Sequence, residues 1–285
     1  TQPTALNVSS TLTHISCKGA NNGSAILSNS GGVAPYSENW GTANPLALSA
    51  GTYAYTITDN NNCNYTDSIT INEPDSLIIS AVTTNVLCNG NYDGTAALNL
   101  VGGTPPYTTN WGGSNPLALN AKSHLVSVTD FNSCTAQKTI IITEPTLLTA
   151  TSNLSHVSCF GLSDGNATLN ISGGIPPYKE DWGIVDSTKL SAATHTYTIT
   201  DSNKCTIQDQ VIITEPTALN VIEVVKNIKC FGENNGTVNL QISGGVAPYI
   251  QNWNGVNTNS LTAGIYPYII TDANYCVVGD SINVL

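Results

Sequence analysis

Apolar and polar residues alternate along several short stretches of the chain, and the same stretches return every 71 residues. Tyr55 and Ile57 share one face of the stretch 52–58, and Ile69 and Ile71 share one face of the stretch that follows. A period of two residues is typical of a β-strand with one buried face. No stretch has the period of a helix, so the pattern predicts an all-β protein.

The repetition runs through all 285 residues without insertion or deletion, which makes four copies of 71 residues and one residue more. Such self-similarity predicts an array of equivalent structural units. We expect four domains, formed by residues 1–72, 73–143, 144–214 and 215–285. A tryptophan and two cysteines mark each copy: Trp40, Trp111, Trp182 and Trp253; Cys17, Cys88, Cys159 and Cys230; Cys63, Cys134, Cys205 and Cys276.

Each copy divides into short predicted strands separated by turn signals. In the first copy we expect strands over about 5–16, from residue 24, around Trp40, over 45–48, over 52–58 and around Ile69 to Ile71. Six or seven such strands predict an Ig-like, two-sheet antiparallel sandwich. Asn29 interrupts the apolar face of the second strand, where the other copies place Leu100, Ile171 and Ile242.

The copies meet at a proline, with Gln2-Pro3 in the place later held by Glu73-Pro74, Glu144-Pro145 and Glu215-Pro216. Proline pushes the preceding residue towards extended geometry, and no Gly/Ser-rich spacer surrounds it. We therefore expect closely coupled neighbours and an extended rod of four domains.

Eight cysteines at fixed spacing are typical of a secreted chain with a disulfide framework. A zinc site is disfavoured, because each copy has two cysteines 46 residues apart and no CxxC. If six strands alternate in direction, the loop after the first strand and the turn before the last lie at the same end of the sandwich. We therefore expect a disulfide within each repeat, as in Cys17–Cys63; the alternative is Cys63–Cys88 across the joint.

Charge is sparse, with a net charge of −11, eight lysines and no arginine. Nucleic acid is excluded as a partner, since a phosphate binder needs a basic surface. No apolar run approaches the roughly 18 residues that predict a membrane span, and no signal peptide is recognisable. We expect a segment from the interior of a longer secreted chain.

The motifs together resemble the SprB repeat. They are C-x-G-x-x-[DN]-G, G-G-x-x-P-Y, the tryptophan, T-[IV]-T-D or its equivalent and the second cysteine, which recur in all four copies, and I-T-E-P, which stands at the end of the second and third copies and is I-N-E-P in the first. Lys122 and Ala193 depart from the pattern by replacing Gly51 and Gly264. The resemblance implies a large, repetitive cell-surface protein of Bacteroidetes, exported by type IX secretion and used in adhesion and gliding.

Histidine is the usual acid or base near neutral pH, but the histidines of this chain do not indicate a catalytic site. His14 and His156 share a position that holds asparagine in the other copies, and His124 and His195 share one that holds tyrosine. Such interchange suits a strand surface. No nucleophile elbow or phosphate loop is present, so we expect no enzyme and no cofactor.

Two interpretations in terms of binding compete with structural roles: sugar binding by the tryptophans and calcium binding by the aspartates. The four tryptophans are either a sugar platform or core residues packed against the disulfide, and we expect the latter. Calcium candidates are Asp59, Asp130, Asp201 and Asp272, with Asp93 and Asp164 on the loop predicted at the same end. A turn closed by the aspartate's own side chain explains Asp-x-Asn equally well.

The pattern Asp-Ser followed by an apolar residue or threonine resembles the O-glycosylation signal of Bacteroidetes. It occurs at Ser68, Ser76, Ser187 and Ser281. We expect glycans there to shield sheet edges from pairing.

The sequence thus predicts a non-enzymatic, structural and adhesive segment of a cell-surface protein, a stiff filament or stalk. Its partners would be a surface polysaccharide, another extracellular ligand, or further copies in a fibre. The alternative is an array of carbohydrate-binding modules.

Overall fold

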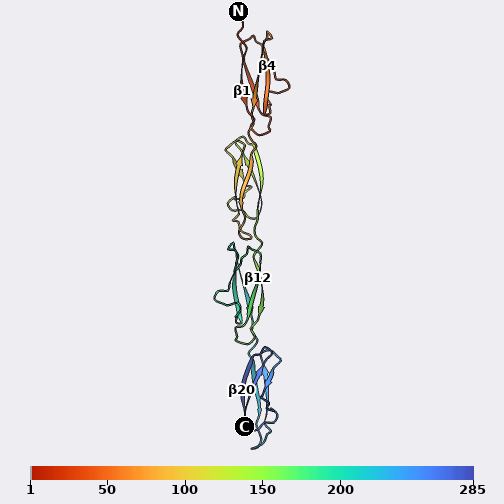
Figure 1. The fold of residues 1–285 in the computed structure, drawn as a ribbon, viewed down its shortest axis with the longest axis vertical. Helices are drawn as coiled ribbons and strands as arrows, with labels where there is room; N and C mark the ends of the chain where they lie inside the picture. Colours follow the sequence, from red (N-terminus) through yellow and green to blue (C-terminus); the bar gives the residue numbers. More distant parts are fainter. Residues whose placement is uncertain (1) are drawn as a thin grey trace. The chain divides into compact units, whose positions relative to one another are not determined.

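The computed structural model describes residues 2–285, which form twenty β-strands, five in each repeat. The first repeat contains β1 (Asn7–Thr13), β2 (Ser24–Ser30), β3 (Ser37–Asn39), β4 (Gly51–Thr58) and β5 (Asn64–Ile71), and Figure 1 labels β1 and β4 in its red and orange part. The prediction of an all-β fold with four copies is confirmed.

The other repeats have the same five strands at the same positions. The second has β6 (Ile78–Thr84), β7 (Thr95–Val101), β8 (Thr108–Asn110), β9 (Lys122–Thr129) and β10 (Thr135–Ile142). The third has β11 (Thr149–Ser155), β12 (Asn166–Ser172), β13 (Lys179–Asp181), β14 (Ala193–Thr200) and β15 (Thr206–Ile213). The fourth has β16 (Asn220–Lys226), β17 (Thr237–Ser243), β18 (Ile250–Asn252), β19 (Gly264–Thr271) and β20 (Val277–Val284). Lys122 and Ala193 begin their strands as Gly51 and Gly264 do, so these departures leave the fold unchanged.

Each repeat is a small antiparallel sandwich. In the first, β1 pairs with β2 in one sheet, while β3, β4 and β5 form the other in that order. Both sheets contribute to one apolar core, in which Ala25 comes from β2 and Tyr55, Ile57 and Ile71 come from β4 and β5. The second, third and fourth repeats have equivalent cores of their own.

The strand count corrects the sequence prediction of six or seven. The segment predicted as a strand over 45–48 makes a single bridge, between Leu48 and Gly23, and runs on to β4. With one strand fewer before it than predicted, β4 runs in the direction opposite to the predicted one. The turn between β4 and β5 then lies at the far end of the sandwich from the loop after β1, where Ile15 hydrogen-bonds Asn72 after β5.

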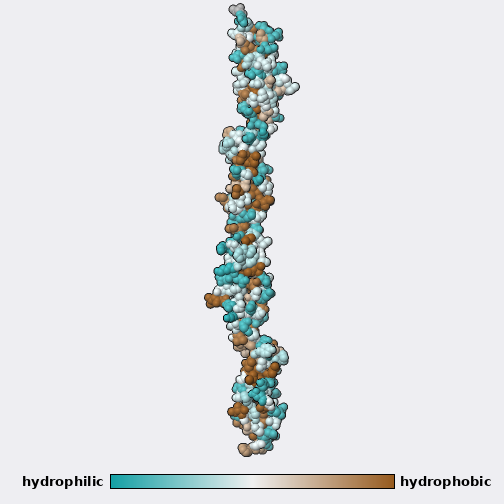
Figure 2. Space-filling view, viewed as in Figure 1, coloured by the Kyte–Doolittle hydropathy of each residue, from teal (hydrophilic) through white to brown (hydrophobic). Residues whose placement is uncertain are grey.

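The chain forms two compact units, Thr1–Glu144 and Pro145–Leu285, and each holds two repeats. On the face drawn in Figure 2, hydrophobic residues form small groups among hydrophilic ones. Residues 2–285 contain no helix with the length and hydrophobicity of a membrane-crossing segment.

Asn29 leaves an unsatisfied polar atom against the core of the first repeat. Its Oδ1 is buried without a hydrogen-bond partner. Such an atom costs about 1–3 kcal/mol, and the equivalent residue of the second repeat is Leu100. We predict that Asn29→Leu stabilises the first repeat by about 1 kcal/mol, seen as slower native-state hydrogen exchange in β2.

The matched control is Ser28→Leu, which changes the neighbouring residue on the exposed face of the same strand. It buries no surface and should leave exchange in β2 unchanged. Faster exchange in Asn29→Leu than in the parent would contradict the assignment of Asn29 as a defect.

Candidate functional site

One end of each repeat is closed by an aspartate turn, defined in the first repeat as Asp59–Cys63. Asp59 is buried, its Oδ1 accepts the N–H groups of Asn61 (2.8 Å) and Cys63 (2.9 Å), and its Oδ2 accepts that of Val33 (2.9 Å). These donors, that of Cys63 above all, hold the pKa of the Asp59 carboxyl below its ordinary value.

The G-G-x-x-P-Y loop lies against this turn and needs its glycines. Gly32 has φ +56°, and a Cβ there would stand 2.8 Å from the Asp59 carboxylate. A Cβ on Gly31 would stand 2.0 Å from the carbonyl oxygen of Ala5. Tyr36 donates its hydroxyl proton to the Gly31 carbonyl (2.6 Å). The loop and the aspartate turn therefore form one packed cap at the start of the repeat.

The calcium interpretation of these aspartates is not supported. Asp130, Asp201 and Asp272 accept backbone N–H groups from the same positions as Asp59 does. A cation would meet N–H donors where it needs free oxygen ligands. Among residues 2–285, no group of three or more acidic, histidine or cysteine side chains is placed to hold a metal ion.

The other end of each repeat carries the cysteine loop, defined in the first repeat as Cys17–Gly23. Asn22 accepts the N–H of Ser16 (3.2 Å), and Asp93 and Asp164 accept the equivalent N–H groups of Leu87 and Ser158. A serine hydroxyl, that of Ser158, lowers the pKa of Asp164 most strongly. These acids therefore organise their own loop, at the opposite end of the repeat from the aspartate turn.

A glutamate that follows the last strand of a repeat accepts a hydrogen bond from the cysteine loop of the same repeat. Glu73 accepts the N–H of Gly19 (2.8 Å) and forms an ion pair with Lys18. Glu144 and Glu215 accept the N–H groups of Gly90 and Gly161 in the same way, each at 2.6 Å. The glutamate of the I-T-E-P motif is thus a structural acceptor within the repeat that precedes the proline.

Two disulfide bonds join consecutive repeats, one in each compact unit. Cys17 of the first repeat bonds Cys134 of the second, and Cys159 of the third bonds Cys276 of the fourth, each pair with Cα atoms 5.6 Å apart. Both bonds join residues 117 apart in the sequence. We call the place where the cysteine loop of one repeat meets the aspartate turn of the next a joint.

The predicted pairing within a repeat is therefore wrong, and so is its alternative between Cys63 and Cys88. The two cysteines of a repeat lie at opposite ends of a five-stranded sandwich, too far apart to meet. Cys63 and Cys230 are free thiols, and both are exposed. Cys88 and Cys205 are disulfide-bonded.

An asparagine in the aspartate turn supports each of these joints. The Nδ2 of Asn132 donates to the carbonyl oxygen of Ser16 (3.1 Å), and that of Asn274 donates to the carbonyl oxygen of Ser158 (2.9 Å). The acceptor is the residue just before the bonded cysteine in both cases. Asparagine recurs at this position in all four repeats, as Asn61, Asn132, Asn203 and Asn274.

The connecting peptide is bound on both of its sides. Glu73 holds the cysteine loop of the first repeat, and two residues later the carbonyl of Asp75 accepts the N–H of Gly103 in the second (2.9 Å). The sandwiches thus meet with almost no free linker, as the sequence predicted for closely coupled neighbours.

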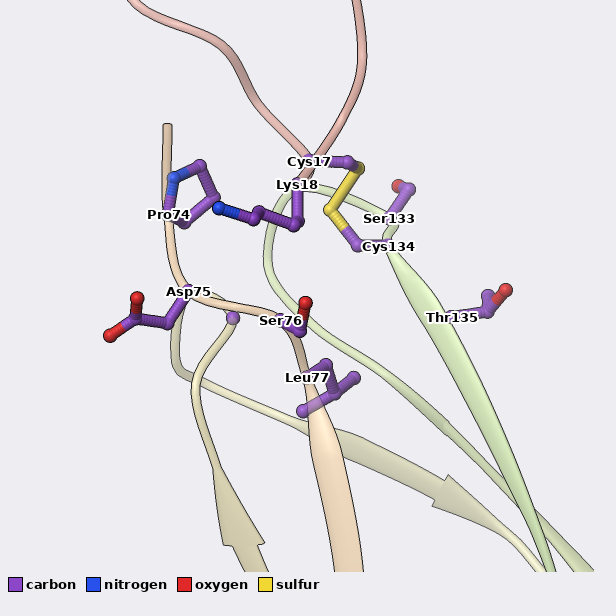
Figure 3. A pocket seen from close by; sticks show the side chains of 10 residues that line it. Cys17, Lys18, Pro74, Asp75, Ser76, Leu77, Ser133, Cys134 and Thr135 are labelled. Carbon is purple, nitrogen blue, oxygen red and sulfur yellow. A yellow bond between two sulfur atoms is a disulfide. The ribbon is translucent and has the colours of Figure 1, made fainter. Parts of the chain in front are cut away.

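A cavity of about 500 Å³ lies beside the first of these joints, and Figure 3 shows its lining. The Cys17–Cys134 bond crosses above it, Ser76 points its hydroxyl towards that bond, and Asp75 points away. The corresponding cavity in Pro145–Leu285 has a more apolar lining, with Phe160, Leu162, Leu219 and Tyr275. Because the residues that line the two equivalent cavities differ in polarity, the cavities are not suited to binding the same small ligand.

The tryptophans pack on the edge of the core. The ring of Trp40 is buried and lies 5.1 Å, centroid to centroid, from that of Tyr55, and Trp182 and Trp253 pair with Tyr197 and Tyr268 at 5.0 and 5.2 Å. Trp111 packs against the core of the second repeat. The predicted core role fits this packing, but the predicted contact with a bridge in the core is wrong, because the disulfides lie at the joints.

The histidines have structural partners. The Nδ1 atoms of His14 and His156 accept the N–H groups of Asn72 and Thr214, as Asn85 and Asn227 accept those of Thr143 and Leu285. His124 and His195 lie near the carbonyl oxygens of Asn120 and Ser191, as the Tyr53 hydroxyl lies near that of Ser49. His124 is buried, so its predicted place on a strand surface is wrong.

Three of the candidate glycosylation sites, Ser68, Ser76 and Ser281, are exposed, and Ser187 is half-buried. Ser76 lines the cavity at the first joint. Glycosylation stays a prediction, for which accessibility is a condition that these serines meet to different degrees.

The family model described as SprB repeat matches the chain four times, over residues 9–43, 80–115, 151–179 and 222–258. Each match covers the cysteine loop and the G-G-x-x-P-Y loop and ends before the aspartate turn. No curated protein matches the chain.

Two solved structures are similar at low identity. Domains 1–6 of surface layer protein SbsC share 14% identity with a TM-score of 0.24, over 84% of this chain and 45% of that one. The N-terminal eight Ig domains of Down Syndrome Cell Adhesion Molecule share 9% identity with a TM-score of 0.28, over 99% and 55%. The chain spans about half the length of either, and the scores are too low to indicate function.

The lowered pKa of Asp59 makes the first cap sensitive to acid. A carboxyl with a depressed folded pKa stabilises the fold above its unfolded pKa of about 4, and that contribution is lost as the pH falls through the folded value. We predict that Asp59→Asn speeds hydrogen exchange in residues 31–36 and 59–63 at pH 7. It should also reduce the further loss of protection between pH 7 and pH 3.

Asp75→Asn is the control, because that carboxylate is exposed and points away from the joint. It should exchange like the parent protein at both pH values. Equal acid sensitivity in Asp59→Asn and in the parent would show that the cap does not depend on this carboxylate.

Proposed function

Because the chain belongs to the SprB repeat family, with four repeats, we propose that it is a non-enzymatic structural and adhesive segment of a large cell-surface protein. Its task is to build a stiff stalk from four domains, residues 1–72, 73–143, 144–214 and 215–285. Export by type IX secretion and a part in gliding belong to the same proposal.

The observation that carries this proposal is the joint. A disulfide, an asparagine side chain and a doubly bound connecting peptide all act between the repeats of one unit. Small sandwiches that are fastened to their neighbours transmit force and resist bending. Disulfides of this kind persist outside the cytosol, which supports an extracellular, cell-surface location.

Adhesion to a surface polysaccharide or another extracellular ligand is the second part of the proposal. Outward residues of the strands provide the varied surface that such contacts need. In this proposal the partners of the chain also include further copies of itself, assembled into fibres.

The alternative, a carbohydrate-binding array, needs exposed aromatic platforms. Three of the four tryptophans instead pair with a tyrosine at 5.0–5.2 Å, and Trp40 is buried. In this alternative, acrylamide quenches the tryptophan fluorescence readily and added polysaccharide shifts it. The proposed stalk predicts weak quenching and no shift.

The stalk proposal predicts a joint whose stiffness depends on its disulfide. Strands advance about 3.3 Å per residue, so four domains on the order of 30 Å each should extend beyond about 100 Å in small-angle scattering. The double variant Cys17→Ser/Cys134→Ser should give a broader distribution of shapes than the parent.

Cys63→Ser is the matched control, since it removes a thiol that forms no bond. Its scattering should coincide with that of the parent. A compact particle, or the same breadth of shapes with and without the Cys17–Cys134 bond, would rule out a stalk stiffened at its joints.

A further inference from the structure

The chain contains four Asn-Gly pairs: Asn22-Gly23, Asn89-Gly90, Asn235-Gly236 and Asn254-Gly255. Glycine has no Cβ and adopts a wide range of conformations, so its backbone nitrogen reaches the side-chain amide of a preceding asparagine easily. That approach starts deamidation, a reaction that makes asparagine thermolabile. We propose that Asn254 is a site of spontaneous deamidation and that the fold protects the other three pairs.

The pairs in the cysteine loops of the first and fourth repeats have both reacting groups in hydrogen bonds. The N–H of Gly23 donates to the carbonyl oxygen of Leu48 (3.1 Å), and the Oδ1 of Asn22 accepts the N–H of Ser16 (3.2 Å). Gly23 is buried. The equivalent bonds of Asn235-Gly236 join the glycine to Leu261 (3.0 Å) and the asparagine to Lys229 (3.1 Å). Neither glycine nitrogen can attack until its bond to the neighbouring segment opens.

The pair Asn89-Gly90 is protected through its glycine. The N–H of Gly90 donates to the carboxylate of Glu144 at 2.6 Å. A hydrogen bond to a charged acceptor is stronger than one to a neutral carbonyl oxygen. This nitrogen is therefore also kept from the side chain that precedes it.

The pair Asn254-Gly255 lies on the turn that follows β18, and both residues are exposed. In the part of the chain that the structure describes, neither the Asn254 side chain nor the Gly255 N–H has a hydrogen-bond partner. The turn is held by two other bonds, from the Asn254 N–H to the Oδ1 of Asn252 (3.0 Å) and from the Val256 N–H to the carbonyl oxygen of Trp253 (3.1 Å). The reacting atoms are thus free, and exposed turns open at little cost in free energy.

Asparagine is tolerated at this turn because the position requires a left-handed backbone. Gly41, Gly112 and Gly183 stand at the equivalent place with φ of +63°, +60° and +67°, and Asn254 has φ +52°. Asparagine adopts this region more readily than most residues that have a side chain. The fourth repeat therefore keeps the turn and alone places a reactive amide in it.

The reaction exchanges an amide for a carboxyl group. The Gly255 nitrogen loses its proton to hydroxide or water and attacks the Cγ of Asn254, so that a C–N bond forms, ammonia leaves and a succinimide ring closes. Water then opens the ring at either carbonyl and gives aspartate or isoaspartate. One water is consumed for each ammonia released, and nothing is oxidised or reduced. Both products add a negative charge beside Trp253, and isoaspartate also adds a carbon atom to the backbone of the turn.

The test incubates the folded, oxidised protein at mildly alkaline pH, digests samples with an acid protease and follows the four Asn-Gly peptides by mass spectrometry. We expect Asn254 to deamidate at least about fivefold faster than each of the other three asparagines, the factor that one protecting hydrogen bond provides. In concentrated urea, which removes the protection by the fold, all four should react at similar rates.

Asn254→Gly is the matched control, because it restores the residue that the other three repeats have at this turn. It should keep the fold and lose most of the acidic species that the aged parent shows in isoelectric focusing. Equal rates at the four pairs in the folded protein, faster reaction at another pair, or an Asn254 that keeps its amide when folded would each overturn the proposal. The inference rests on local contacts and is independent of the proposed function.

Discussion

The covalent bond between consecutive repeats governs how this protein obtains its stability. A repeat of about 70 residues buries a small core, and small domains usually need a staple. Closing a loop of more than 100 residues contributes about 4–5 kcal/mol in the chain-entropy model. Because the Cys17–Cys134 loop includes most of two sandwiches, that stabilisation belongs to the pair and couples their unfolding.

The polar groups around the bond explain why the pairing is specific. Asp130 fixes the turn that carries Asn132 and Cys134, and Asn132 reaches the backbone just before Cys17. Glu73 holds the cysteine loop in place from its own repeat. The cysteines are therefore presented by two rigid elements, and the oxidation of one loop depends on the packing of the next.

Much of this arrangement could be predicted from the sequence. The period of 71 residues gave four copies, and alternation placed Tyr55 and Ile57 in the core, where both are buried.

The disulfide pairing could not be found in this way, because it depends on whether the strand directions change an even or an odd number of times. One segment of four residues, 45–48, decided that number, and it forms a bridge and no strand. The recurring asparagine of the aspartate turn was a usable signal, since in both joints its side chain donates to the backbone of the preceding repeat. The family resemblance did not supply the pairing either, because the matched residues leave out the second cysteine of every repeat.

Stretching single molecules by their termini tests the central claim, that the disulfides join successive repeats. A bond between Cys17 and Cys134 and one between Cys159 and Cys276 shield the residues that they enclose from force. At about 3.3–3.6 Å per extended residue, the oxidised chain should then lengthen to roughly a fifth of the full contour, and reducing agent should release the remainder. An oxidised chain that extends to roughly a third of the contour would contradict the account, because that length is expected if every repeat closes its own disulfide.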